Sequence, residues 1–73
     1  MSEIQKGKEP YSVKEVSKII RTNRAYVYKL IKSGLLPATK MGSYKIDEDD
    51  FEKFLKFCKG KDVTDPYNVR MLD

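Results

Sequence analysis

Apolar residues in the first third of the chain recur every three or four positions, at Val13, Val16, Ile19 and Ile20. This spacing places them on one face of a helix. Ser12 and Glu15 match a capping box, in which each side chain hydrogen-bonds a free backbone amide at the helix start. We predict a first helix over residues 13–20.

A second amphipathic segment follows after RTN, which is long enough only for a tight turn. Asn23 is a favourable N-cap, and Gly34 suits the helix end because glycine readily adopts positive φ. We predict a second helix over residues 24–33. Its inner face, which we expect to pack on the first helix, consists of Val27, Leu30, Ile31 and Gly34. Two short helices joined by such a turn make a helix-turn-helix.

The segment LLPATKMGSYKI changes character, and Pro37 is incompatible with a continued helix. The stretches ATKM and YKI alternate like strands around Gly42 and Ser43. A two-residue Gly-Ser loop suits a type II′ turn, with glycine where φ is positive. We predict a two-stranded hairpin over residues 37–46, a wing beside the helix-turn-helix.

The last strong pattern is DEDDFEKFLKFCKG. Asp47 is a suitable N-cap, and the acids at 48–50 lie where the helix dipole favours negative charge. Gly60 closes a helix whose apolar residues, spaced by three and four, are Phe51, Phe54, Leu55 and Cys58. The predicted fold is mainly α with a small β-hairpin: a winged helix-turn-helix with three helices and a two-stranded wing.

The two ends of the chain lack such a pattern. Residues 1–9 are polar, and we expect a flexible N-terminal arm. Residues 61–73 have no period and include Pro66, and we expect a flexible C-terminal tail. The 73 residues are enough for one small domain, which we place at residues 10–60.

The charge of the chain is unevenly distributed. The net charge is +4, but residues 11–46 carry eight bases and one acid, a net +7. Residues 47–59 carry three bases and five acids, a net −2. A basic region of this kind favours a polyanion as partner, and a lysine-rich solvated surface would give the same count.

The predicted helix over residues 24–33 has two distinct faces. Ala25, Lys29 and Lys32 lie opposite the inner face, and Tyr26 and Tyr28 lie on its two flanks. Lysines can neutralise phosphates or donate to guanine, and a small alanine lets the backbone approach the bases of a major groove. The tyrosines could donate to phosphates, or could cover the core edge with their hydroxyls in water.

Three stretches carry a resemblance to a known family: SVKEV, VYKLIKSGLLPA, and the KI before the acidic helix. Over residues 11–55 the chain resembles the excisionase-type winged helix-turn-helix domain of the MerR-like superfamily. The resemblance implies that the second helix enters the major groove and that the wing touches the neighbouring minor groove or backbone. It implies contacts by Arg24, Tyr28 and Lys29, and by the wing from Lys40 to Lys45.

The wing KMGSYKI is about one residue shorter than is usual in that family, and Ser43 stands at the tip where a base is common. We therefore expect Lys40 and Lys45 to contact backbone rather than bases. The turn RTN replaces a more usual glycine-containing turn, and we expect Arg21 in it as a further phosphate contact. The predicted DNA-binding residues are Arg21, Arg24, Ala25, Tyr26, Tyr28, Lys29, Lys32, Lys40, Ser43 and Lys45.

The function that the resemblance implies is sequence-specific binding to double-stranded DNA. An excisionase binds and bends DNA to promote integrase-mediated excision of a mobile element. Its partners would be double-stranded DNA, a tyrosine-type integrase and, cooperatively on DNA, further copies of the chain. A small transcriptional regulator of the same fold is one alternative. A protein-interaction adaptor that uses Phe57 and the C-terminal tail is an alternative from another class.

The sequence offers little for catalysis or for metal binding. It has no histidine and a single cysteine, Cys58, which falls on an apolar helix face and is expected in the core. The acidic run DEDD lacks the glycine and spacing of a calcium loop. We expect no enzymatic activity, metal or cofactor. No long apolar run or signal-peptide core is present, so we expect a cytoplasmic protein.

Overall fold

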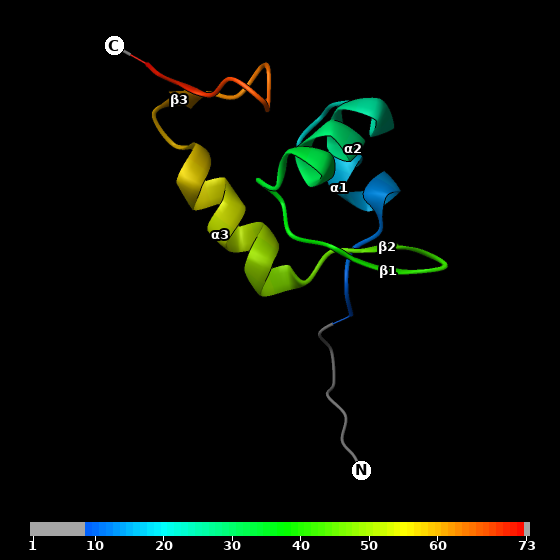
Figure 1. The fold of residues 1–73 in the computed structure, drawn as a ribbon. Helices are drawn as coiled ribbons and strands as arrows, with labels where there is room; N and C mark the ends of the chain where they lie inside the picture. Colours follow the sequence, from blue (N-terminus) through cyan, green and yellow to red (C-terminus); the bar gives the residue numbers. More distant parts are fainter. Residues whose placement is uncertain (1–8, 73) are drawn as a thin grey trace.

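The computed structural model describes residues 9–72, so the arm expected over residues 1–9 lies, except for Glu9, outside the described residues. Within them, the helices and the wing follow the predicted order, and a second strand pair follows the last helix (Figure 1). The elements are α1 (Val13–Ile19), α2 (Arg24–Ser33), β1 (Thr39–Met41), β2 (Ser43–Lys45), α3 (Glu48–Cys58), β3 (Lys61–Asp62) and β4 (Arg70–Met71).

Local signals define the start of α1 and both ends of α2, as predicted. The capping box is complete: the Ser12 amide donates to Glu15 at 2.8 Å, and the Glu15 amide donates to Ser12 at 3.1 Å. Asn23 Oδ1 accepts from the Tyr26 amide at 2.8 Å and starts α2. Gly34 ends α2 with φ of 89°. The helix-turn-helix is therefore specified by short-range chemistry, although α1 ends one residue earlier than predicted.

The face of α1 that packs against α2 differs from the predicted one. Ile19, expected inside, is 50% exposed, whereas Ser17 is buried. The small Ser17 side chain lies in the same helical row as Val13 and Val16, and its hydroxyl donates to the Lys14 carbonyl at 2.7 Å. Its polar group is therefore satisfied, which makes its burial inexpensive. The apolar core consists of Val13, Val16, Val27, Leu30, Leu36, Ile46, Phe51 and Phe54.

The wing is an antiparallel pair that extends away from the helices (Figure 1). Its turn is tighter than predicted. Met41 pairs with Ser43, so Gly42 alone connects the strands, with φ of 76°. Ser43 belongs to β2 rather than to a two-residue loop. At the base of the wing, the backbones of Tyr11 and Ile46 exchange hydrogen bonds of 2.8 and 2.9 Å.

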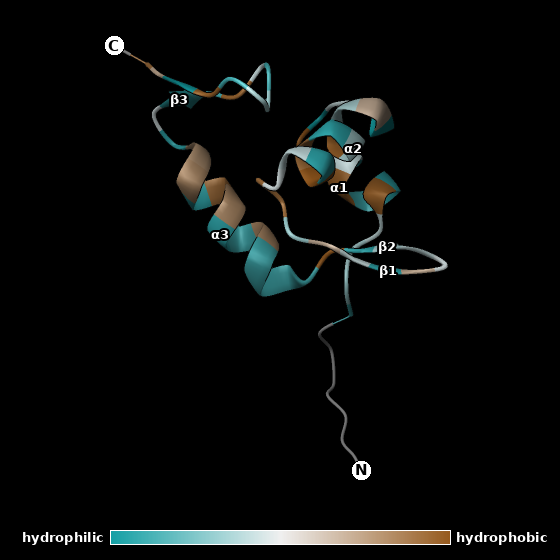
Figure 2. Ribbon diagram, viewed as in Figure 1, coloured by the Kyte–Doolittle hydropathy of each residue, from teal (hydrophilic) through white to brown (hydrophobic). Residues whose placement is uncertain are grey.

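The third helix covers the core with one face. Asp47 caps it, accepting from the Asp49 amide at 3.1 Å. Its N-terminal half is hydrophilic, and apolar residues concentrate toward its C-terminal half (Figure 2). Cys58 is half-buried at the core edge, and burial raises the pKa of its thiol. Within residues 9–72, no helix is both long and apolar enough to cross a membrane.

The flexible tail expected after residue 60 is instead a second hairpin. Strand β3 pairs with β4, with Lys61 opposite Met71 and Asp62 opposite Arg70. The loop between them is buttressed by side chains: Asp62 Oδ1 accepts from the Thr64 amide at 3.0 Å and from its hydroxyl at 2.6 Å. Pro66, expected in a loose segment, is buried. Turn chemistry and a few long-range contacts thus order a segment that has no hydrophobic period.

Candidate nucleic-acid interface

The outer face of α2 is open, as its periodicity predicts. Val27 and Leu30 are fully buried on the inner side. Ala25, Lys29 and Lys32 are exposed on the opposite side. Because the buried residues fix the rotation of the helix, the two lysines and the alanine project outward together.

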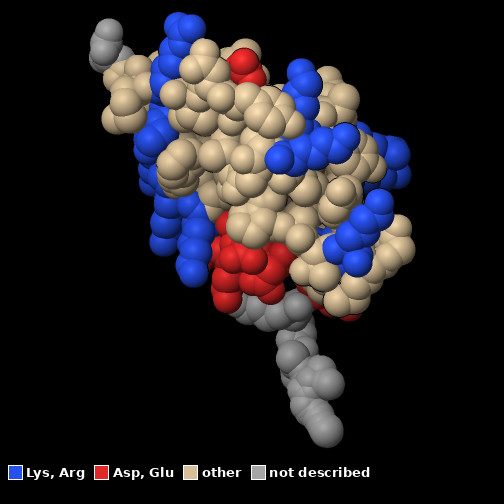
Figure 3. All heavy atoms as spheres, viewed as in Figure 1, with Lys and Arg blue, Asp and Glu red and all other residues tan. Residues whose placement is uncertain are grey.

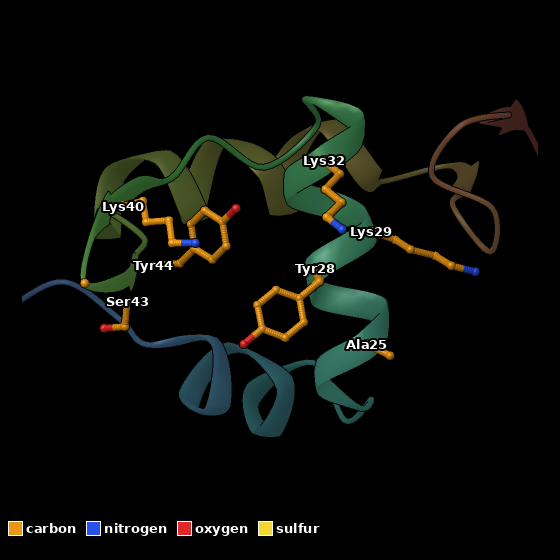
Figure 4. Close-up of a pocket in the computed structure, with 8 residues that line it drawn as sticks. Ala25, Tyr28, Lys29, Lys32, Lys40, Ser43 and Tyr44 are labelled. Carbon is orange, nitrogen blue, oxygen red and sulfur yellow. The ribbon is translucent and has the colours of Figure 1, made fainter.

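A groove of about 620 Å³ lies between this face and the wing (Figure 4). It joins residues that are far apart in the sequence. Helix α2 contributes Ala25, Tyr28, Lys29 and Lys32, and the wing contributes Lys40, Gly42, Ser43 and Tyr44. Among the described residues that line it, three are lysines and none is an acid. The groove is therefore a cationic channel with walls from two separate elements.

An aromatic pair connects the two walls of the groove. The rings of Tyr28 and Tyr44 lie 5.9 Å apart, inclined at 56°. Lys40 Nζ lies 5.2 Å from the centre of the Tyr44 ring, so the wing lysine is held beside the pair. In Figure 4, Lys40 reaches toward Tyr44, whereas Lys29 points away from the wing. The tyrosines thus set the spacing between helix and wing, and the lysines surround them.

Sequence reasoning did not identify Tyr44 as part of this site. The signal that could have found it is the strand register: Lys40 pairs directly with Tyr44 when Gly42 alone forms the turn. The two-residue turn that we predicted shifts this register by one position.

Comparison with known proteins supports the helix-turn-helix fold. A family model described as a helix-turn-helix domain matches residues 10–59, which include α1, α2, the wing and α3. The chain belongs to this helix-turn-helix family. Proteins of this class bind DNA, with the second helix of the motif lying in the major groove. The match ends before the second hairpin.

The chain is also similar to a curated protein, the uncharacterized protein YvgK of Bacillus subtilis (strain 168). The two are 36% identical over 45 residues. The aligned region covers 60% of this chain and 15% of YvgK, so the chain spans only a small part of that relative. No solved structure gives a significant match.

Tyr26 lies outside the groove of the helix-turn-helix domain, and its predicted role in DNA contact is not supported by its position. Its hydroxyl donates to the carbonyl of Val63 in the second hairpin, and its ring packs against the core. Burial, reinforced by the nearby Cys58 and Asp62, raises the pKa of the Tyr26 hydroxyl. The hydroxyl is engaged within the domain, on the flank opposite Tyr28.

Three other predicted contacts also lie outside the groove lining. Arg24 is the first residue of α2 and is exposed, as is Arg21 in the turn before it. Arg21 adopts φ of 57°, the left-handed conformation that glycine often supplies in such turns. Lys45 is half-buried at the end of β2, opposite Thr39. Of the ten predicted residues, the groove therefore gathers six: Ala25, Tyr28, Lys29, Lys32, Lys40 and Ser43.

Proposed function

We propose that this helix-turn-helix protein binds double-stranded DNA sequence-specifically, with α2 in the major groove and the wing on the adjoining backbone. The observation that supports this most directly is the cationic groove between α2 and the wing. Its lysines come from both walls, and its described lining includes no carboxylate that would repel a phosphate. Such a channel suits the sugar-phosphate strand that separates a major groove from the neighbouring minor groove.

Each element of the groove has a distinct part in this proposal. Lys32 and Lys40, on opposite walls, neutralise phosphates of the strand between them. Ala25 allows the helix backbone to come close to the bases. Lys29 points away from the wing and is the side chain placed to reach a base edge (Figure 4). Tyr28, 40% exposed, offers its hydroxyl as a phosphate donor.

The biological role that we propose is that of an excisionase. The support is the family match together with the resemblance of residues 11–55 to excisionase-type domains of the MerR-like superfamily. In this role the protein bends DNA at the ends of a mobile element, binds there cooperatively, and directs a tyrosine-type integrase toward excision.

Alanine substitution tests whether α2 is the recognition helix. Lys29→Ala and Tyr28→Ala should each weaken specific duplex binding by roughly 1–3 kcal/mol, the range for a good base or charged contact. Fluorescence anisotropy on a duplex selected with the wild-type protein measures this. Tyr67→Ala is the matched control, because Tyr67 is 63% exposed and lies in the second hairpin. Unchanged affinity for both α2 variants would rule out α2 as the recognition helix.

A salt titration tests the assignment of the wing to the backbone. Lys40→Ala and Lys45→Ala should weaken binding to all duplexes similarly. Each should reduce the slope of log affinity against log salt by about one. Loss of sequence preference with an unchanged slope would show base contact instead.

An excision assay separates the excisionase from a regulator of the same fold. Purified integrase and the two ends of a candidate element are incubated with and without the protein. Promotion of excision by the wild type, and not by Lys29→Ala, is expected. Specific DNA binding without any promotion of excision would favour a transcriptional regulator.

A further inference from the structure

The charges of α3 are separated along its length. Over the whole helix region, acids outnumber bases, yet every acid lies at or before Glu52. From residue 53 to residue 61 all charged residues are lysines: Lys53, Lys56, Lys59 and Lys61. Figure 3 shows the result, with basic side chains along the α3 side of the molecule and the acidic cluster at its N-terminal end. The net charge of −2 over residues 47–59 is the sum of these two surfaces and therefore hides the basic one.

Three of these residues, Lys53 and Lys56 in α3 and Lys59 at its C-cap, form what we call the α3 lysine row. All three are exposed. The opposite side of α3 is fixed against the core by Phe51 and Phe54, which are buried. No described residue of α3 lines the groove between α2 and the wing, and α3 lies behind both elements when the groove is viewed from its open side (Figure 4). The row is therefore a second basic surface, separate from the groove.

Just beyond the row, the side chain of Lys61 is held in place by Phe57. Lys61 Nζ donates to the Phe57 carbonyl at 2.8 Å and lies 4.5 Å from the centre of the Phe57 ring. A lysine near the C-terminal carbonyls of a helix is favourably placed with respect to the helix dipole. Phe57 remains 42% exposed beside the row, so an aromatic ring is interleaved with the cations.

The dimensions of the row suit a DNA backbone. Lys53 and Lys56 are about 4.5 Å apart along the helix axis at 1.5 Å per residue, and Lys59 follows at the C-cap. A duplex carries a charge about every 1.7 Å of its axis when both strands are counted. Several phosphates therefore lie within reach of the three side chains. Lysines are flexible point charges without the planar fork that arginine offers to a carboxylate. They favour sequence-independent contact with a regular array of phosphates over docking of one acidic peptide.

We propose that the α3 lysine row binds the backbone of a second DNA segment, so that one molecule bridges two duplex segments. This inference rests on the proposed function, because the first segment is the one held by α2 and the wing. The row supplies affinity without sequence preference. The contact is weak alone and becomes effective when the first duplex brings a second one near.

The test uses the full chain and two short duplexes. One carries a site selected with the wild-type protein and a donor fluorophore; the other has unrelated sequence and an acceptor. The row variant is Lys53→Gln, Lys56→Gln and Lys59→Gln together, and it leaves Lys61 and its contacts intact. Bridging, measured by energy transfer at low salt, should fall at least about fivefold, and its salt slope should fall by about three. Affinity for the site duplex alone should stay within about twofold.

Two further variants distinguish failure of the bridging proposal from failure of the proposed function. Arginine at the same three positions keeps the charge and should restore bridging. A groove variant, Lys29→Gln with Lys32→Gln and Lys40→Gln, should lose the site duplex. If the groove variant keeps full affinity for the site duplex, the proposed function fails whatever the row does.

Several results would overturn the bridging proposal itself. One is wild-type bridging by the glutamine variant, and another is failure of the arginine variant to restore bridging. A third is an equal loss of single-duplex binding and bridging, which would make the row part of the first interface. A fourth is that the row binds polyglutamate and does not bind the second duplex. That result would show that the partner of the row is an acidic protein.

Discussion

The two hairpins of this protein are built by different means. In the wing, β1 and β2 are joined by Gly42 alone, and the paired residues are neighbours in sequence. In the second hairpin, two-residue strands are separated by residues 63–69. Its loop is held by its own side chains, since Asp65 Oδ1 accepts from the Tyr67 amide at 3.0 Å. At the open end of the hairpin, the Leu72 amide donates to the Gly60 carbonyl at 2.9 Å, and in the loop the Val63 carbonyl accepts from the Tyr26 hydroxyl of α2. The wing is a local structure, whereas the second hairpin requires support from the rest of the fold.

The hairpins also meet α2 on opposite flanks, each through one tyrosine. Tyr28 packs against Tyr44 of the wing, and Tyr26 donates to Val63 of the second hairpin. The residue between them, Val27, is fully buried. The two phenols therefore have different tasks. One lines the surface that we assign to DNA, and the other fixes the helix to the body of the protein.

Deletion of residues 62–73 should have the largest effect on stability. It removes Val63 from the core edge, the buried Pro66 and the hydrogen bond to Tyr26. Partial burial of an apolar side chain and one hydrogen bond together predict a loss of about 2–4 kcal/mol in the free energy of unfolding. Urea denaturation measures it. An unchanged unfolding midpoint would mean that the second hairpin does not brace the fold.

The same deletion should leave DNA binding nearly intact where the protein stays folded. None of the groove-lining residues is removed. Affinity for a short duplex should stay within about threefold, or about 0.7 kcal/mol. Reduced cooperation with an integrase, beyond this small change, would support the idea that the C-terminal segment also contacts a protein partner.

Gly42→Val should have the opposite effect, reducing DNA binding more than stability. A β-branched residue is strongly disfavoured at φ of 76°, although a Cβ there would meet no atom within 4 Å. The cost is therefore conformational, and the exposed wing can fray without opening the core. We expect about a 5–10-fold loss in duplex affinity, or about 1–1.4 kcal/mol, with a smaller change in unfolding free energy. A large loss of stability with normal binding would contradict this.

The contrast between the hairpins also explains what the sequence could predict. Helix starts at Ser12, Asn23 and Asp47 and the turn at Gly42 are local signals, and the helices and the wing follow them. Two of the groove lysines, Lys29 and Lys32, follow from the rotation of α2, which its apolar residues reveal; the third, Lys40, comes from the wing. The partner of Tyr26 lies 37 residues away along the chain, and no periodicity encodes it. The second hairpin was missed because its strands are too short to alternate.

Tyr26→Phe and Tyr28→Phe compare the two flanks of α2 directly. Each keeps the ring and removes the hydroxyl. Tyr26→Phe should lower the free energy of unfolding by about 0.5–1.5 kcal/mol, the net worth of one hydrogen bond, and leave duplex affinity unchanged. Tyr28→Phe should weaken binding and leave stability unchanged. Melting curves and fluorescence anisotropy on the same two samples check this. Weaker duplex binding by Tyr26→Phe would show that Tyr26 belongs to the DNA interface.

Acidification should affect the second hairpin and not the wing, and it is the smallest effect that we expect. The hydroxyl and the amide of Thr64 hydrogen-bond the Asp62 carboxylate, with a lesser contribution from Arg70, and they hold the pKa of Asp62 below its usual range. Because the folded state lowers this pKa, the stabilisation is fully present above the unfolded value of about 4. It is lost as the pH falls through the lower folded value. Residues 37–46 contain no acid, so the wing has no such group.

Amide exchange resolved by residue can follow this change. Protection of the Thr64 amide should decrease on acidification below about pH 4, while the paired amides of the wing keep their pH profile. Asp62→Asn is the control, because the amide retains an acceptor oxygen and cannot be protonated in this range. The pH dependence at Thr64 should therefore disappear in that variant. A decrease that persists in Asp62→Asn, or one shared by the wing, would show that acid acts on the fold as a whole and not on this turn.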